Sequence, residues 1–272
     1  MAWKLNLPIR HNYGYLDVLA MFKAIFMSKS SQKDIFNSVE QKLNKILESD
    51  VFLTASGTTA FIHIIKQINN RDKNEIVLPV HLCAKIAISA VRLGLKIKLY
   101  DVMAENFSVN YDSLKGQLSN KTLAVLVMHS WGVIQDFSPL NSLKKRYGFS
   151  VIEDCCQAFG AKFKGKSVGH QGDFAFFSFS HMKTVSAMGL GCMLLGKNNR
   201  NKNQIDIIKK DTFFNIISLS VYIITTHPLI YRLFHKIIKK RAAVYANKRM
   251  NDYITLPKLI LLNRVIEHWD DI

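Results

Sequence analysis

The feature that most constrains the fold of this chain is a series of short, continuous Val, Ile and Leu runs with helix-like segments between them. Expected strands lie at residues 51–54, 75–79, 96–101, 123–128 and 149–153, and expected helices at residues 32–47, 61–68, 83–93 and 140–147. Continuous apolar runs are typical of strands that are buried on both faces of a parallel sheet. The pattern therefore predicts an α/β fold in which helices cover a mostly parallel sheet.

Charge and cysteine content narrow the class of protein. The 272 residues carry a formal net charge of +17, which would favour an anionic partner, but no zinc-finger spacing, RNA-binding aromatic signature or helix-turn-helix accompanies it. We therefore expect no nucleic-acid partner. The four cysteines form neither CxxC pairs nor a disulfide framework, and the apolar run 15–27 contains Asp17 and Lys23, so it makes a poor signal peptide. These features indicate a cytoplasmic protein with reduced thiols.

Polar residues follow several of the expected strands. They are the Ser56 turn, residues 81–83, residues 129–131 and Asp154. Ligands of open α/β sheets bind beyond the carboxyl ends of the strands, so this convergence predicts a binding site at one edge of the sheet.

Residues 56–58 (Ser-Gly-Thr) join an expected strand to an expected helix. Backbone N–H groups and the positive end of a helix dipole at such a turn suit a phosphate, which makes Ser56, Gly57 and Thr58 candidate phosphate ligands. The same tripeptide is also consistent with an ordinary helix N-cap.

Residues 151–195 carry the reactive groups. Asp154 ends a buried strand, Gln157 is expected one helical turn further on, and Lys183 follows an aromatic strand that contains Ser178. An Asp and a Lys at one sheet edge are what a pyridoxal phosphate enzyme needs, since the Lys forms the Schiff base and the Asp pairs with the ring nitrogen. Gln157 could hydrogen-bond the phenolic oxygen and Ser178 the phosphate. Taken singly, Asp154 could instead cap a following helix, and Gln157 and Lys183 could be solvated surface residues.

The motifs around these residues resemble the DegT/DnrJ/EryC1/StrS family of sugar aminotransferases. The resembling segments, in order, are residues 55–58 (ASGT), 77–79 (VLP), 129–132 (HSWG), 151–160 (VIEDCCQAFG), 169–173 (GHQGD) and 178–183 (SFSHMK). The resemblance covers about residues 38–195. It implies the three-layer α/β/α large domain of a type I pyridoxal phosphate-dependent transferase, with a helical C-terminal segment.

The resemblance also implies site roles that agree with those inferred from the residues. Lys183 would be the Schiff-base lysine, Asp154 would contact the ring nitrogen, and Gln157 would lie near the phenolic oxygen. Gly57, Thr58 and Ser178 would contact the phosphate.

Three positions bear on the activity and the cofactor contacts that the resemblance implies. Some relatives replace the lysine with His and dehydrate sugars, so the retained Lys183 favours transamination although His181 is close by. Cys83 stands where the family usually places an aromatic residue over the cofactor ring, and its sulfur could pack there more weakly. Residues 187–191 (AMGLG) replace an acidic, glycine-rich turn and contain no Glu.

The segment after residue 198 differs in composition. Residues 212–231 carry no charge, and residues 232–249 contain seven Lys or Arg residues and no acidic residue. An apolar stretch followed by a basic one indicates a hairpin on an anionic membrane surface, at the inner face of the membrane; a helical insertion packed on the body or across a dimer interface is equally consistent.

These observations divide the chain into a cofactor-binding large domain (1–198), a basic and apolar insertion (199–249) and the start of a truncated C-terminal domain (250–272). The expected protein is a homodimeric aminotransferase that transfers an amino group, from glutamate, to a nucleotide-linked keto-deoxysugar for surface polysaccharide or a related glycan. No metal is expected.

Two alternatives to this activity remain. One alternative is a catalytically silent remnant that acts as a scaffold or subunit. Another is a pyridoxal phosphate enzyme acting on amino acids, for which Cys155 and Cys156 offer weak support.

Overall fold

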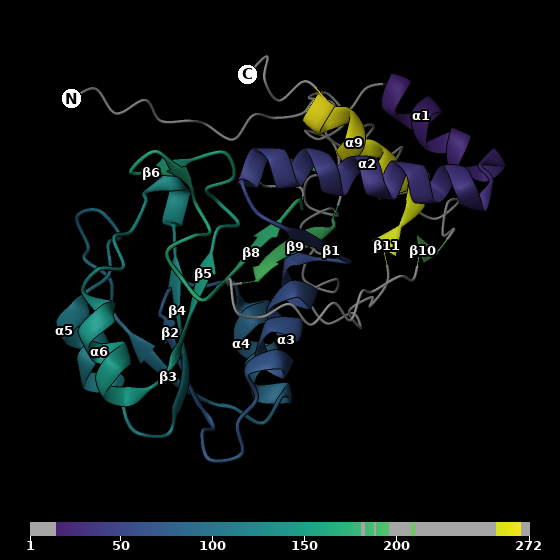
Figure 1. The fold of residues 1–272 in the computed structure, drawn as a ribbon. Coiled ribbons are helices and arrows are strands. Elements are labelled where there is room, and N and C mark those ends of the chain that lie inside the picture. Colours follow the sequence, from purple (N-terminus) through teal and green to yellow (C-terminus); the bar gives the residue numbers. More distant parts are fainter. Residues whose placement is uncertain (1–14, 181–182, 188, 196–207, 210–253, 268–272) are drawn as a thin grey trace, which may run out of the picture.

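A seven-stranded sheet forms the centre of the molecule (Figure 1). The computed structural model describes residues 15–180, 183–187, 189–195, 208–209 and 254–267. In spatial order the strands are β1 (Val51–Thr54), β9 (Gly191–Leu195), β8 (Phe174–Ser178), β5 (Ser150–Asp154), β4 (Thr122–Met128), β2 (Glu75–Pro79) and β3 (Lys96–Tyr100). Strand β9 is antiparallel to both of its neighbours, whereas the pairs from β8 to β3 are all parallel.

Helices lie on both faces of this sheet. They are α1 (Tyr15–Phe26), α2 (Lys29–Leu47), α3 (Gly57–Ile68), α4 (Ala84–Arg92), α5 (Tyr111–Gln117), α6 (Leu140–Tyr147) and α9 (Leu256–Glu267). Strand β4 shows how the layers form, because Ala124 and Leu126 pack with α3 and α4, while Val125 and Val127 pack with α5 and α6. Alternate side chains of a strand point to opposite faces, so a continuous apolar run fills two cores at once. The predicted three-layer α/β/α architecture is confirmed.

Three small elements complete the described fold. They are the hairpin of β6 (Lys162–Phe163) and β7 (Lys166–Ser167), the parallel pair of β10 (Ile208–Lys209) and β11 (Ile254–Thr255), and the 3₁₀ turn η1 (Ser130–Gly132).

Most elements expected from the sequence lie within a few residues of their observed bounds. Strand β2 coincides with the expected 75–79, and α2 extends the expected helix at 32–47 by one turn to its Ser28 N-cap, whose side chain accepts from the N–H of Ser31. Residues 155–161 form successive turns and not a helix. The interpretation of Asp154 as a helix cap was therefore wrong, and Gln157 does not lie on a helix.

Helix α9 packs against α1 and α2, near the β1 edge of the sheet (Figure 1). Its Leu259 and Leu262 belong to the same core as α2, and its Arg264 forms an ion pair with Asp17 at 3.1 Å. Within the described residues, no helix combines the length and the apolar character needed to cross a membrane. The segment 212–249, for which membrane contact is expected, lies outside the described residues.

Candidate active site

The carboxyl ends of β2, β4, β5 and β8 and the start of α3 meet at one edge of the sheet. The parallel direction of these strands forces this arrangement, because every loop that leaves a strand leaves it on the same side. Most of the residues expected from the sequence to form the site lie on these loops.

The phosphate candidates lie against β8. Ser56 is the N-cap of α3, and its Oγ accepts a hydrogen bond from the N–H of Thr59 at 3.1 Å, so the cap interpretation of this turn is confirmed. The approach is close: a Cβ on Gly57 would lie 2.8 Å from Cβ of Ser178 and 3.1 Å from the carbonyl oxygen of Phe177. Glycine at position 57 is therefore needed for the first turn of α3 to lie beside Ser178, and the structure brings these two phosphate candidates together.

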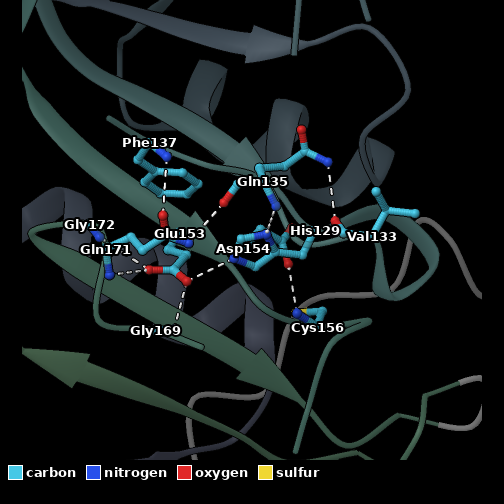
Figure 2. Close-up of polar contacts among 10 residues, drawn as sticks. All are labelled: His129, Val133, Gln135, Phe137, Glu153, Asp154, Cys156, Gly169, Gln171 and Gly172. Atoms are coloured by element: carbon cyan, nitrogen blue, oxygen red, sulfur yellow. Dashed lines mark hydrogen bonds and ion pairs between the residues drawn. The ribbon is translucent and has the colours of Figure 1, made fainter. Parts of the chain in front are cut away.

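Asp154 is buried at the end of β5, with 3% of its surface exposed. Its Oδ1 accepts a hydrogen bond from the N–H of Cys156 at 3.0 Å (Figure 2). Burial raises the pKa of Asp154 above its usual value, and this rise is opposed by the Cys156 hydrogen bonds and by the charge of Lys183. A carboxyl group in such surroundings is ionised more readily when a cation lies beside it.

Lys183 is half-buried, and its backbone N–H donates to the carbonyl oxygen of Ser180 at 3.1 Å. Its positive charge lowers the pKa values of Asp154 and of the Cys156 thiol, although burial keeps both above their usual values. The two residues that carry the reactive groups in the sequence therefore lie within electrostatic range of each other. His181, the residue that bears on dehydration, lies outside the described residues.

Gln157 and Cys83 lie at the border of the site. The Oε1 of Gln157 accepts a hydrogen bond from the backbone N–H of Trp131 at 2.6 Å, which ties the loop after β5 to the loop after β4. Cys83 is exposed at the N-cap of α4, where its side chain makes no capping hydrogen bond.

Sequence reasoning did not assign a role to His81, Ser130 or Trp131, although it placed all three after strands. His81 Nε2 and Ser130 Oγ lie 2.5 Å apart, and the His81 ring stacks on Trp131 with 6.1 Å between centroids. Burial lowers the pKa of His81, and the charge of Asp154 opposes this effect. The signal that could have found these residues was their common position after β2 and β4.

Behind the site, Glu153 and His129 form a fully buried pair (Figure 2). His129 Nδ1 accepts from the N–H of Gln135 at 3.1 Å, so Nε2 carries the proton and donates to Glu153 Oε1 at 2.8 Å. The carboxylate also accepts from the backbone N–H groups of the turn that precedes β8, those of Gly169, Gln171 and Gly172.

This network explains two properties of the buried pair. Burial alone would raise the pKa of Glu153, but the hydrogen bonds from His129, Gly169 and Gly172 lower it below its usual value. His129, Glu153 and Cys155 also lie close enough together to be considered as metal ligands. Because both nitrogens of His129 and both oxygens of Glu153 already have hydrogen-bond partners, the geometry describes a scaffold that fixes β4, β5 and the 169–172 turn.

The fold and site define an α/β protein in which a buried carboxyl group and a lysine lie beside a helix N-terminus. Residues 21–215 match the model of the DegT/DnrJ/EryC1/StrS aminotransferase family, and the chain belongs to this family.

Relatives and solved structures agree with the family. The chain is 28% identical over 141 residues to UDP-N-acetyl-3-dehydro-alpha-D-glucosamine 3-aminotransferase of Acidithiobacillus ferrooxidans, a match that covers 52% of this chain and 38% of that protein. It is 25% identical over 197 residues to GDP-perosamine synthase of Vibrio cholerae, covering 70% of this chain and 53% of that protein. The chain therefore spans about half or less of the length of these two relatives.

Among solved structures, the putative sugar aminotransferase Spr1654 of Streptococcus pneumoniae, in its PLP form, superimposes with a TM-score of 0.68 at 14% identity, covering 96% of this chain and 66% of that one. At this identity the similarity establishes the shared fold.

Proposed function

We propose that this protein is a pyridoxal phosphate-dependent aminotransferase that transfers an amino group, from glutamate, to a nucleotide-linked keto-deoxysugar in glycan biosynthesis. The observation that carries the proposal is that a buried carboxyl group, Asp154, lies at the sheet edge within electrostatic range of Lys183, in a chain of this family. At the same edge Ser178 lies against the start of α3.

The residues present fit the cofactor. Asp154 is buried and its pKa is raised, so a protonated ring nitrogen beside it would favour the ionised form of this carboxyl group. Ser178 and the N-terminal turn of α3, with Ser56, Gly57 and Thr58, offer hydroxyl and N–H donors to a phosphate. Gln157 and Cys83 would border the ring.

When bound, pyridoxal phosphate supplies an electron-withdrawing ring that stabilises negative charge on the carbon that loses its proton. Asp154 would place a negative charge beside the ring nitrogen, which would favour the protonated ring. Lys183 would hold the cofactor through its Nζ, and the same Nζ, when free, would act as the general base that moves the proton. Asp154 is shielded from water, with 3% of its surface exposed, and this low exposure strengthens charge interactions at its carboxyl group.

The substrate class rests on the names of relatives. UDP-, GDP- and dTDP-linked sugars are named in several of them, including the dTDP-3-amino-3,6-dideoxy-alpha-D-galactopyranose transaminase of Aneurinibacillus thermoaerophilus. Glutamate is the proposed donor.

The proposal includes an organisation of the chain in three parts: a cofactor-binding domain at 1–198, an insertion at 199–249 and the start of a C-terminal domain at 250–272. It also includes a homodimer that works in the cytoplasm. The insertion touches the inner face of an anionic membrane through residues 212–249, with seven basic residues in 232–249 as the charge that supports this contact. Flotation with anionic liposomes tests it: binding should disappear when Lys236, Lys239, Lys240 and Arg241 are neutralised, and binding that survives contradicts it.

The cofactor proposal is tested by borohydride reduction of the protein mixed with pyridoxal phosphate, followed by peptide mass spectrometry. The cofactor should be found covalently attached at Lys183, and adding glutamate before borohydride should remove the label. A Lys183→Ala variant should not be labelled at this position, and Lys162→Ala, which removes an exposed lysine of β6, is the matched control. If wild-type protein is not labelled at Lys183, the enzyme proposal fails and a scaffold or subunit role replaces it.

A further inference from the structure

Three aromatic rings form a cluster at the carboxyl edge of the sheet, beside the loop that carries Asp154. They belong to His81, Phe107 and Trp131, which follow β2, β3 and β4, three strands that are adjacent in the sheet. Phe107 and Trp131 contact each other with 4.4 Å between ring centroids, and His81 lies 6.0 Å from Phe107 and 6.1 Å from Trp131. The cluster therefore extends from the carboxyl edge near Asp154 toward the β3 edge of the sheet.

The exposure of these rings is unusual for a packed aromatic cluster. Trp131 is 63% exposed and Phe107 is 41% exposed. Both residues have left-handed backbones, with φ of 49° for Trp131 and 55° for Phe107. Such conformations cost free energy in residues with bulky side chains, and strained residues tend to cluster at active sites and ligand-binding loops.

Two contacts connect the cluster to the cofactor site. The backbone N–H of Trp131 donates to Gln157, the residue proposed to lie at the phenolic oxygen, and His81 lies within the electrostatic range of Asp154. A ligand on this cluster would therefore lie beside the cofactor.

The cluster also carries polar groups. Ser130 is buried and pairs with Nε2 of His81, while the buried Nδ1 of His81 has no hydrogen-bond partner among the described residues. A buried polar atom without a partner is costly, so the polar side of this cluster is not fully satisfied by the described residues.

Aromatic faces beside hydroxyl and imidazole groups match one ligand chemistry. A hexose ring presents C–H groups on its faces, which pack on the negative faces of aromatic rings, and hydroxyl groups on its rim, which need hydrogen-bond partners. We propose that His81, Phe107 and Trp131 form a subsite for the hexose ring of a nucleotide-linked sugar, with the exposed rings of Phe107 and Trp131 packing on its C–H faces.

The choice of hexose over nucleobase rests on the proposed function. The carbon that receives the amino group belongs to the hexose and must lie beside Lys183. The base is separated from it by a ribose and a diphosphate, and so lies farther from Asp154 and Gln157.

Trp131 provides the direct test. The chain has three tryptophans, so a Trp3→Phe, Trp269→Phe background leaves Trp131 as the only one. Quenching of its fluorescence by acrylamide is measured with GDP-mannose, dTDP-glucose or UDP-N-acetylglucosamine, and with GDP, dTDP or UDP alone. We expect at least one sugar nucleotide to protect Trp131 at a concentration at which its bare nucleotide does not. Equal protection by the bare nucleotide would assign the cluster to the base and overturn the proposal, as would no protection by any of the three sugars.

Variants test the same point without fluorescence. Titration calorimetry with the best sugar nucleotide should show about tenfold weaker binding for Trp131→Leu, the size expected for one aromatic contact, and most of the affinity should return in Trp131→Phe. Phe107→Leu should also weaken binding. Phe26→Leu, which removes an 87% exposed ring of α1, is the control and should not.

Two further outcomes would overturn the subsite. Equal losses in Trp131→Leu and Trp131→Phe would show that ring stacking is not the cause. A Trp131→Leu variant that dissociates into smaller particles on sedimentation, with sugar binding unchanged, would make the cluster a subunit contact. Labelling of Lys183 is a separate measurement, so the proposed enzyme activity can fail while the sugar subsite stands, and the reverse.

Discussion

Two neighbouring carboxyl groups at the end of β5 are held in opposite ways. Glu153 and Asp154 are both buried, and as consecutive strand residues they point to opposite faces of the sheet. Glu153 accepts four hydrogen bonds, and its pKa is lowered; Asp154 accepts far fewer, and its pKa is raised by burial. The difference separates a carboxylate that is held by the fold from one whose partner is proposed to be the cofactor.

The largest effect on stability should come from Glu153→Gln. The amide would place an N–H₂ group against N–H donors of the 169–172 turn or of His129, so we expect the free energy of unfolding to fall by about 3 kcal/mol. Urea denaturation of the cofactor-free protein measures this loss.

The control for this change is Glu75→Gln, at a partly buried carboxylate of the same sheet, which pairs with Lys98 at 2.9 Å. Its loss should stay below about 1 kcal/mol, because a pair near the surface contributes little. Equal losses for the two variants would contradict the scaffold role of Glu153.

Asp154→Asn should act mainly on chemistry. The neutral amide cannot hold a negative charge at the ring nitrogen, so we expect the half-reaction with glutamate to slow by about a hundredfold or more. Stopped-flow absorbance of the cofactor measures the rate. Asp101→Asn, at an exposed carboxylate that follows β3, is the matched control, and an unchanged rate in Asp154→Asn would remove Asp154 from the proposed mechanism.

The same Asp154→Asn change should stabilise the cofactor-free protein. Burial makes the ionised form of Asp154 costly, and the amide avoids that cost, so the free energy of unfolding at pH 7 should rise by about 1 kcal/mol. The sign is opposite to that expected for Glu153→Gln. A loss of stability on urea denaturation would show that Asp154 is as well satisfied as its neighbour.

The smallest expected effects are changes with pH in the stability differences between each variant and the wild type. The pKa of Glu153 is lowered by folding, so its contribution is present above the unfolded-state pKa of about 4.3 and is lost as the pH falls through the folded pKa. The pKa of Asp154 is raised, so its group favours the folded state below about pH 3.9 and loses that contribution as the pH rises through the folded pKa.

Both variants should therefore approach wild type in acid. Urea denaturation at pH 7 and at pH 4 should show the loss in Glu153→Gln and the gain in Asp154→Asn each becoming smaller at the lower pH. If the stability difference between either variant and the wild type becomes larger at pH 4, the direction assigned to the pKa shift of the replaced carboxyl group is wrong.

Much of this arrangement was predictable from the sequence, because the determining signals are local. Continuous apolar runs predicted β2, β4 and β5 as buried strands, and the geometry of parallel sheets then predicted that Ser56 and Asp154 would meet at one edge. The proximity of Lys183 to Asp154 followed from the same rule.

The rest depends on contacts between distant segments. From the sequence, Glu153 looks like an ordinary strand residue, because its hydrogen-bond partners in the 169–172 turn are distant in the chain. The stacking of His81 on Trp131 depends on a left-handed backbone at Trp131, which no local sequence pattern indicates. The antiparallel direction of β9 was also not predicted, since an apolar run carries no information about strand direction.

Strand β9 has a consequence for how the chain reaches this fold. In the described sheet β1 pairs with β9 alone, and Thr54 lies opposite Gly191, roughly 140 residues later. At common rates of synthesis, on the order of ten seconds or more pass between the appearance of β1 and that of its partner strand. During that interval on the ribosome β1 has an unpaired backbone, so the N-terminal segment is a candidate for chaperone binding until residues 191–195 emerge.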